Sequence, residues 1–375
     1  MKTIIIHLIS VLVAISLKAQ NPSYINEKPV TINGYTLDAM EPHLSTDGNA
    51  IFFNSLNDGI TTSLHYAGRV NDTVFTYIGL VPIVNQTITP RLDAVASVDT
   101  ANNFYWVSTR SWPSINENLE RIRFLTSGYN NRGKVYGDFY INAPGWLIMD
   151  AAINYYGDKL IYCNALFNGC SGGPCKASMG IAQKINDSTF NKTPTSTTLF
   201  ASINDTSNYI VYAPFLTKDE LELYYTRLLK GGTQTEVMVA TRSSTTAVFG
   251  TPTVLVTAPS VFPEASTLTN DKLKMYYHKY VSGKYELHLR YRVLNTDIYE
   301  NASEALYTIF PNPTSNNLCI TSHTVLNSVT IYNLLGEIVV KLKSNNTKEE
   351  IAMRDLPNGI YIISAHGYYS KVIKE

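Results

Sequence analysis

The chain has 375 residues, and its 30 Lys and Arg balance 30 Asp and Glu, so its formal net charge is zero. This balance excludes the basic surplus expected of a nucleic-acid-binding protein and the acidic surplus of a solvating tail. Its 26 tyrosines and lack of long helical periodicity favour an all-β protein, because aromatic side chains fill half-buried pleated sheets well.

The first predicted element is a signal peptide over residues 1–19. Residues 1–3 form a short basic start, residues 4–17 are almost wholly apolar, and Ala19 supplies a small residue at the cleavage point. The run is short for a membrane span, no later stretch approaches the required length, and no Cys follows it as in a lipoprotein. We therefore expect export, cleavage near Ala19 and no transmembrane segment in the mature chain.

Five similar segments follow within residues 20–296, and their starts are about 50 to 63 residues apart. Each has a turn built on Asp, Asn or Gly, residue types that tolerate the positive φ of a tight turn, and then a continuous apolar triplet. A continuous triplet suits a strand that is packed on both faces, as in a propeller blade. The segments are Glu41 to Phe53, Asp93 to Trp106, Asp150 to Tyr162, Ala213 to Tyr225 and Glu264 to Tyr277.

The order Pro, Ser, Asp-Gly turn and apolar strand in residues 41–53, and its looser copy in residues 213–225, resembles the TolB-like family of β-propeller repeats. The other three segments lose the Pro or the Ser. The resemblance implies a five-bladed β-propeller. Residues 28–32 resemble residues 251–256, which end the fourth unit, whereas the fifth unit stops near residue 294 without such a strand. We predict that residues 26–34 supply it and join the first and last blades, which leaves no exposed sheet edge.

An acid opens four of the five units at nearly equivalent positions: Glu41, Asp93, Asp150 and Glu264, with Ala213 in the other unit. Inner propeller strands line a channel, so these carboxylates are expected to ring its mouth and to need compensation. Three interpretations stay open. The acids accept backbone amides of the next blade, they bind a cation such as Ca²⁺ or another ligand, or they act as acid and base, as in five-bladed glycoside hydrolases. No other cofactor is predicted.

Trp112 is a second candidate ligand-binding residue, because a flat ring beside Asn and Arg side chains can hold a sugar face; the alternative is that Trp112 and Trp146 only cover loops. No nucleophile elbow, phosphate-binding glycine loop, zinc-binding His-Glu-x-x-His or calcium loop is present, so no catalytic residue is assigned. Cys170 and Cys175 flank a short Gly-Pro loop and are disulfide candidates in an exported chain, with free thiols as the alternative.

The last residues, about 305–375, follow a predicted linker at 297–304 and contain short β-rich runs separated by turns. Three motifs and a basic end occur in order, and their residues are Pro311, Asn312, Pro313, Gly336, Asn358, Gly359, Tyr361, Lys371 and Lys374. This series resembles the type A sorting domain of the bacterial type IX secretion system. The resemblance implies a small immunoglobulin-like β-sandwich, handling by that secretion machinery, and a destination outside the cell or on the outer-membrane surface.

The sequence thus predicts an exported propeller followed by a sorting domain. Its function is predicted to be non-enzymatic binding of an extracellular partner, such as a glycan, a peptide or a surface component. The alternatives are a glycoside hydrolase that uses the channel-mouth carboxylates and a structural protein of the cell envelope. Fold alone is a weak warrant for any of them.

Overall fold

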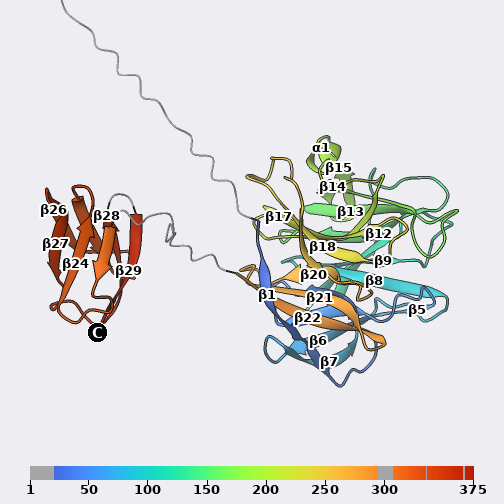
Figure 1. Ribbon diagram of the computed structural model, residues 1–375. Helices are drawn as coiled ribbons and strands as arrows, with labels where there is room; N and C mark the ends of the chain where they lie inside the picture. The colour runs from blue at the N-terminus through green and yellow to red at the C-terminus, as the bar shows by residue number, and fades with distance from the viewer. Residues whose placement is uncertain (1–20, 294–306, 335, 366–367) are drawn as a thin grey trace, which may run out of the picture. The chain divides into compact units, whose positions relative to one another are not determined.

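The computed structural model describes residues 21–293, 307–334, 336–365 and 368–375 (Figure 1). The described chain forms two compact units, residues 21–293 and the residues from 307 onward, and each is treated by itself. The predicted signal peptide, its cleavage point and the predicted linker lie outside the described residues. Strands make up most of both units, which confirms the all-β prediction. No helix of the described residues is long and apolar enough to cross a membrane.

Five sheets make up the first unit. The first strand of each predicted repeat lies in a different one of these sheets. The first sheet contains β3 (Met40–Leu44), β4 (Ala50–Asn54), β6 (Leu64–Arg69), β7 (Val74–Leu80) and β2 (Thr31–Asn33). The second contains β8 (Arg91–Val98), β9 (Asn103–Ser108), β10 (Leu119–Leu125), β11 (Gly128–Lys134) and β5 (Thr61–Thr62). The third contains β12 (Trp146–Ile153), β13 (Lys159–Leu166), β14 (Lys176–Asn186) and β15 (Thr189–Lys192).

The helix α1 (Ser196–Leu199) precedes the fourth sheet. That sheet contains β16 (Tyr209–Leu216), β17 (Glu222–Leu229), β18 (Thr235–Thr241) and β19 (Thr253–Thr257). The fifth contains β20 (Glu264–Leu268), β21 (Lys274–Val281), β22 (Lys284–Arg292) and β1 (Tyr24–Pro29). We call β3, β8, β12, β16 and β20 the inner strands. Each of them contacts the next in this order, and β20 contacts β3, so the contacts are cyclic.

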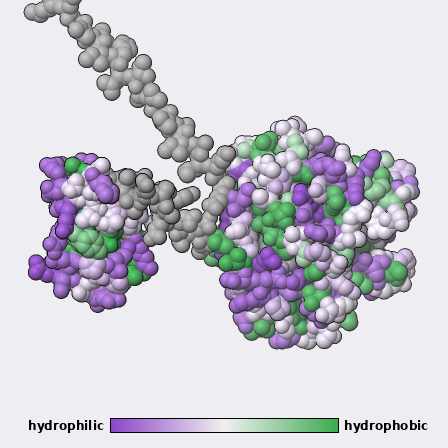
Figure 2. Space-filling model, viewed as in Figure 1, coloured by the Kyte–Doolittle hydropathy of each residue, from purple (hydrophilic) through white to green (hydrophobic). Residues whose placement is uncertain are grey.

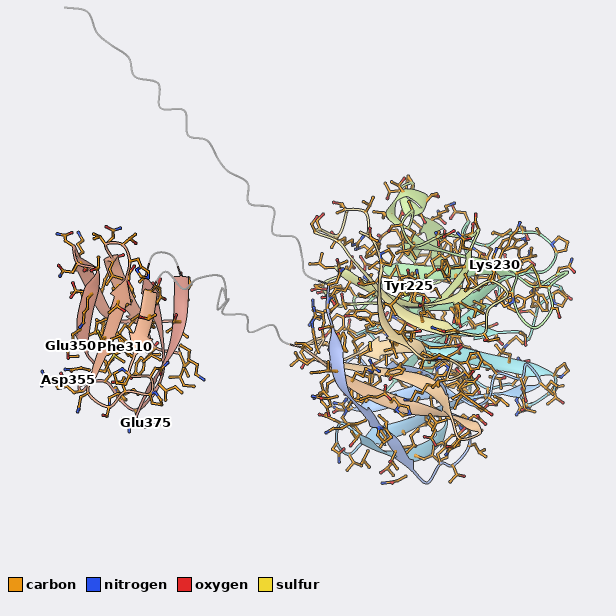
Figure 3. The ribbon with its side chains drawn as sticks, in the orientation of Figure 1. Tyr225, Lys230, Phe310, Glu350, Asp355 and Glu375 are labelled. Atoms are coloured by element: carbon orange, nitrogen blue, oxygen red, sulfur yellow. A yellow bond between two sulfur atoms is a disulfide. The ribbon has the colours of Figure 1, made fainter. Side chains whose placement is uncertain are left out.

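Apolar and aromatic side chains fill the space between neighbouring sheets. Tyr225 of β17, for example, lies in the core shared by the third and fourth sheets (Figure 3). The buried triplets predicted from the repeats explain this packing, because a sheet covered on both faces needs apolar side chains on both. On the visible face of each unit, polar side chains are interspersed with small apolar patches (Figure 2).

The N-terminal residues complete the fifth sheet. In Figure 1 the blue β1 lies along the orange β22, and the two strands pair antiparallel, with Tyr24 opposite Arg292 and Pro29 opposite His288. The prediction that N-terminal residues supply the missing outer strand is confirmed, although the strand begins at Tyr24 instead of residue 26. Residues 31–33 do not belong to it: as β2 they pair in parallel with β7 of the first sheet. Residues 24–33 therefore connect the fifth sheet to the first.

Two sheets form the second unit, and they share one apolar core. One contains β23 (Tyr307–Phe310), β24 (Asn317–Ser322) and β27 (Lys348–Ala352). The other contains β26 (Ile338–Ser344), β25 (Asn327–Tyr332), β28 (Gly359–Ala365) and β29 (Tyr368–Lys374).

Several motif residues of the second unit hold its ends together. The side chain of Asn312 donates to the carbonyl of Lys371 at 2.8 Å and accepts the amide of Ile373 at 2.9 Å. Nζ of Lys374 donates to Asn358 at 3.2 Å. The basic C-terminal end is thus hydrogen-bonded both to the first motif and to the motif that contains Asn358.

Candidate functional site

Every inner strand has one break in its pairing with the second strand of its sheet. At four of the five breaks a residue adopts a left-handed backbone, with φ between +51° and +57°. A bulge of this kind turns the strand and leaves an N–H group outside the ladder. The four residues are Glu41, Val95, Ala213 and Ala265.

Polar side chains of the preceding sheet accept these N–H groups, as buried amides require. The donor and acceptor residues are Glu41 with Nδ1 of His278 (3.0 Å), Val95 with Oδ1 of Asn54 (3.4 Å), Ala213 with the carboxylate of Asp150, and Ala265 with Oγ1 of Thr226 (2.9 Å). Three amides further along the inner strands are held in the same way: Leu44 by Thr267 (3.2 Å), Val98 by His43 (3.2 Å) and Ile153 by Ser97 (2.9 Å). The inner strands are thus joined by side-chain hydrogen bonds as well as by packing.

Three of the four predicted acids come together where the inner strands meet, and we call Glu41, Asp150 and Glu264 the acid cluster. Both other carboxylates act electrostatically on Glu41. Oε1 of Glu41 accepts a hydrogen bond from Asn57 at 3.0 Å. Oε2 of Glu41 and Oδ2 of Asp150 are buried and have no hydrogen-bond partner among the described residues. Nε2 of His278 lies 3.6 Å from Oε2 of Glu264.

The cluster shifts the proton affinities of its members. Burial, followed by the charges of Asp150 and Glu264, raises the pKa of Glu41 well above its ordinary value. Burial also raises the pKa of Asp150 to about 7, against the opposing effect of the Ala213 amide and with a further increase from Glu264. Burial and the neighbouring Glu264 raise the pKa of the Tyr212 hydroxyl, which is hydrogen-bonded to that carboxylate. Burial and mutual repulsion therefore favour the protonated forms of Glu41 and Asp150.

The space beside the acid cluster is small. A cavity of about 30 Å³ is lined by Glu41, His43, Asp150 and Ser266 together with apolar residues of the inner strands. A water molecule in the liquid occupies about 30 Å³, so this cavity has room for a water but not for a sugar ring. Among the described residues, no group of three or more His, Cys, Asp or Glu side chains is arranged to hold a metal ion.

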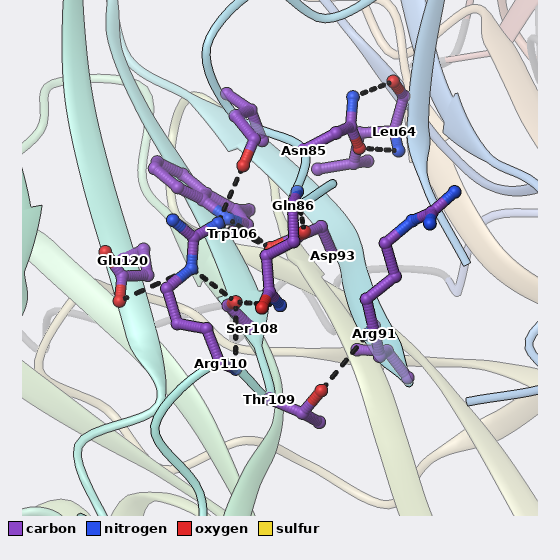
Figure 4. A network of polar contacts seen from close by, with 12 residues as sticks. Leu64, Asn85, Gln86, Arg91, Asp93, Trp106, Ser108, Thr109, Arg110 and Glu120 are labelled. Carbon is purple, nitrogen blue, oxygen red and sulfur yellow. Dashed lines mark hydrogen bonds and ion pairs between the residues drawn. The ribbon is translucent and has the colours of Figure 1, made fainter. Parts of the chain in front are cut away.

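Asp93 does not join the cluster, and the predicted equivalence of the four acids is wrong at this position. Its Oδ1 accepts hydrogen bonds from Arg110 at 2.8 Å and from the indole of Trp106 at 3.1 Å, and its Oδ2 accepts the amide of Gln86 at 2.7 Å (Figure 4). The left-handed residue of β8 is Val95, two positions after Asp93. Asp93 thus stands two positions before the residue that corresponds to Glu41, and it lies within the second sheet, where it pairs with Arg110.

Trp112 is half-buried and lies beside an open cleft instead of forming an exposed platform. Its Nε1 donates to the carbonyl of Trp146 at 3.3 Å, which connects the two loops that line the cleft. We call this space of about 490 Å³ the loop cleft; it is lined by residues 113–117 and 142–145. Asn116 donates across it to Asn142 at 2.5 Å. Glu117 is the one carboxylate in its lining.

The cysteines differ in their environment. A disulfide joins Cys170 to Cys175 in the loop between β13 and β14. Cys163 is buried and free, and its thiol donates to the carbonyl of Val211. Cys319 is free and half-buried in β24. Cys163 lies opposite Asp150 in the β12–β13 pairing, and burial together with the charge of Asp150 raises the pKa of its thiol well above the ordinary value.

Comparison with known families identifies the second unit. Residues 308–375 match the family model of the secretion system C-terminal sorting domain. The match finds a type IX sorting domain over this part of the chain. The match supports export by the type IX system, handling by its machinery, and secretion or attachment at the cell surface. The predicted TolB-like family is not matched by any family model over the first unit.

Solved structures that are similar to this chain include several glycoside hydrolases. A family 117 glycoside hydrolase from the marine bacterium Zobellia galactanivorans has 10% identity and a TM-score of 0.46, with 72% of this chain and 90% of that chain covered. An endo-arabinase from Bacteroides thetaiotaomicron has 13% identity and a TM-score of 0.46, with 72% and 99% covered. The catalytic domain of an α-L-arabinofuranosidase from Coprinopsis cinerea has 13% identity and a TM-score of 0.45, with 72% and 96% covered. No curated protein sequence matches the chain.

His278 and Tyr212 are the members of the site that the sequence analysis did not assign. His278 lies directly opposite Glu264 in the β20–β21 pairing, so the register of the fifth unit's hairpin was the signal that could have found it. Tyr212 stands one position before the bulge in β16, as Glu264 stands one position before the bulge in β20. Bulge positions are not visible in the sequence, so no comparable signal marked Tyr212.

Proposed function

We propose that the first unit is a five-bladed β-propeller of TolB-like repeats that acts outside the cell as a non-enzymatic binding module for a glycan. The cyclic contacts of the inner strands and the N-terminal strand in the fifth sheet support the propeller. The mature chain would start after cleavage near Ala19. Its ligand would bind in the loop cleft, where Trp112 acts as a positioning residue.

The observation that carries this proposal is the separation of the acids from the open space. Glycoside hydrolysis commonly uses two carboxylates that flank the sugar, about 5 to 10 Å apart. The loop cleft has room for a sugar but contains only Glu117 as an acid. The acid cluster has several carboxylates but only about 30 Å³ beside it, and Asp150 is engaged with the Ala213 amide. The loop cleft is therefore suited to binding a sugar, and the acid cluster is suited to joining neighbouring sheets.

The side chains of the loop cleft also fit a polyhydroxyl ligand. Ser114, Asn116 and Asn142 supply hydroxyl and amide groups, and Lys and Arg are absent from the lining. Neutral hydroxyl groups exchange their water hydrogen bonds for bonds to such side chains without loss of a charge. Pro113 and Ile115 add apolar surface for the C–H face of a sugar.

The exported form of the protein should be incubated with immobilised polysaccharides, with retention and released sugar both measured. We expect retention on at least one polysaccharide without release of product. Asn116→Ala should weaken retention roughly tenfold, because one hydrogen bond of about 1 to 1.5 kcal/mol is lost. Asn130→Ala, in the exposed part of β11 and outside the cleft, is the matched control and should bind normally. Equal affinity of the two variants would remove the loop cleft as the site.

A glycoside hydrolase remains the second candidate because of one feature, the raised pKa of Asp150 beside Glu41. A carboxylic acid with a pKa of about 7 is suited to general acid catalysis at neutral pH. If the polysaccharide panel releases product and Asp150→Asn abolishes the release while Asn116→Ala does not, the acid cluster would be the active site and the binding proposal would be wrong.

A further inference from the structure

The structure contains a second open cleft of different chemistry, between the first and second sheets. It has a volume of about 540 Å³, within the range of small-molecule sites. We call it the wedge cleft. Four rings from facing strands line it, namely Phe52 of β4, Tyr66 of β6, Phe104 of β9 and Phe124 of β10. Nothing in the proposed glycan binding uses this cleft.

The other spaces between sheets are filled by apolar side chains from outer strands and from connecting segments. Between the third and fourth sheets, Leu199, Phe200 and Ile203 from α1 and the residues after it complete the core. Between the fifth and first sheets, Val30 and Ile32 do so. Further examples are Phe139 and Phe190 between the second and third sheets, and Tyr24 between the fourth and fifth.

Between the first and second sheets, the connection after β7 supplies only Val81 and Val84. Phe52, Tyr66 and Phe124 are consequently only partly buried at this position. Ile78 of β7, which also lines the cleft, remains 56% exposed. Contact between these apolar rings and water is unfavourable. A fitting apolar ligand that displaces the water from the cleft would remove this free-energy cost.

The lining disfavours anionic ligands. It contains no Lys, Arg or His, and Asp47 is its one carboxylate. Oδ1 of Asp47 accepts hydrogen bonds from Ser45 at 2.6 Å and the Asn49 amide at 3.0 Å, and its Oδ2 accepts one from the Asn49 side chain at 2.9 Å. An anionic ligand would therefore lose water without gaining a counter-charge, and a cationic one would meet only this exposed carboxylate, whose oxygens already accept three hydrogen bonds.

The lining also disfavours a sugar, because most of it is aromatic or aliphatic and a polyhydroxyl ligand would leave hydroxyl groups unpaired. The exposed side chains of Asn49 and Asn102 lie in the same lining and offer a small number of polar partners. From these observations we infer that the wedge cleft binds a neutral small molecule with a flat aryl ring, held between the rings of the first and second sheets. This goes beyond the proposed glycan binding and does not depend on it.

The inference is tested with 1-N-phenylnaphthylamine, a neutral aryl dye whose fluorescence rises in apolar surroundings. The wild-type protein should bind it saturably with one site, and the anionic dye anilinonaphthalene sulfonate should bind at least about tenfold more weakly. Ile78→Glu places a charge in the lining and should weaken binding of the neutral dye at least about tenfold.

Leu80→Glu is the matched control. Leu80 follows in the same strand, is 52% exposed and is not part of the lining, so this variant should bind the dye as the wild type does. Because both side chains are largely exposed, we expect both variants to keep the wild-type melting temperature.

Absent dye binding in the wild type, or equal loss in the two variants, would overturn the inference. So would a wild-type dimer that Ile78→Glu converts to a monomer in sedimentation analysis, because a second copy of the chain would then be the occupant.

Discussion

Deletion of residues 21–29, which removes β1, should lower the melting temperature of the first unit by more than about 10 °C or prevent its folding. The strand completes the fifth sheet, and its loss exposes the edge of β22 and opens the junction with the first sheet. Loss of the buried Tyr24 ring alone should cost about 3 to 5 kcal/mol. The free energy of unfolding of an ordinary domain is about 5 to 15 kcal/mol. Each kcal/mol lost lowers the melting temperature by about 2 to 4 °C in a domain of this size class.

Polar contacts of β1 add to this loss. The Tyr24 hydroxyl hydrogen-bonds to the hydroxyl of Tyr224 at 3.0 Å. Glu27 pairs with Lys279 and with Arg290 and accepts a hydrogen bond from Tyr277. Although burial opposes it, the hydrogen bonds from these three groups lower the pKa of Glu27 to about 2. Deletion would leave Lys279, Arg290 and Tyr277 without this partner.

Thermal unfolding followed by circular dichroism measures the effect, with deletion of residues 307–375 as the control. The control removes more strands but leaves the first compact unit intact, so the melting of that unit should not change. A synthetic peptide of residues 21–33, added to the shortened protein, should restore part of the lost stability by strand addition. An unchanged melting temperature after deletion of residues 21–29 would show that β1 does not close the fold.

The sequence predicted the sheets well because their signal is repeated. Each turn followed by an apolar triplet marks the end of an inner strand and the start of the second strand of the same sheet. Five copies of this pattern indicate five sheets, even where a single copy such as Asp93 to Trp106 is weak. The missing outer strand of the fifth unit was also visible, because residues 28–32 resemble the strand that ends the fourth. Its start differed by two residues, as is usual for strand boundaries read from sequence.

The site was predicted less well because one residue of register decides which way a side chain points. Glu41 and Asp150 were placed together correctly, four residues before Ser45 and Asn154, the first residues of their turns. Asp93 lies six residues before the corresponding Asp99, and its side chain therefore pairs with Arg110 in the second sheet. The bulges of β3 and β8 have the same length, so the offset of two residues is already present in the sequence, where the distance from each acid to its turn could have shown it.

Asp150→Asn should stabilise the protein above pH 7 and leave its stability almost unchanged at pH 4. The folded-state pKa of Asp150, about 7, lies above its unfolded value near 3.8, so the folded protein binds more protons than the unfolded chain between these values. The contribution of Asp150 is therefore most favourable below about pH 4 and is lost as the pH rises through 7. A shift of about three pKa units corresponds to about 4 kcal/mol at most. Asparagine cannot ionise, and its carbonyl can still accept the Ala213 amide.

The difference in free energy of unfolding between Asp150→Asn and the wild type isolates the effect of Asp150 from that of the other titrating groups. Burial lowers the pKa of His43, His65 and His288 to about 4, so wild-type stability also falls on acidification below about pH 6.5. These histidines are common to both proteins and cancel in the comparison. Urea unfolding at pH 4, 5.5, 7 and 8.5 gives the free energy of unfolding of each. A difference that stays constant across this range would contradict the raised pKa of Asp150.

The coupling within the acid cluster gives this comparison a second arm. Glu41→Gln should stabilise in the same direction, because burial and the charges of Asp150 and Glu264 raise the pKa of Glu41. The double variant should gain less than the sum of the single ones, since removing either charge relieves part of the repulsion felt by the other. Strict additivity would mean that the two carboxylates do not interact, and the acid cluster would then be three separate contacts between sheets.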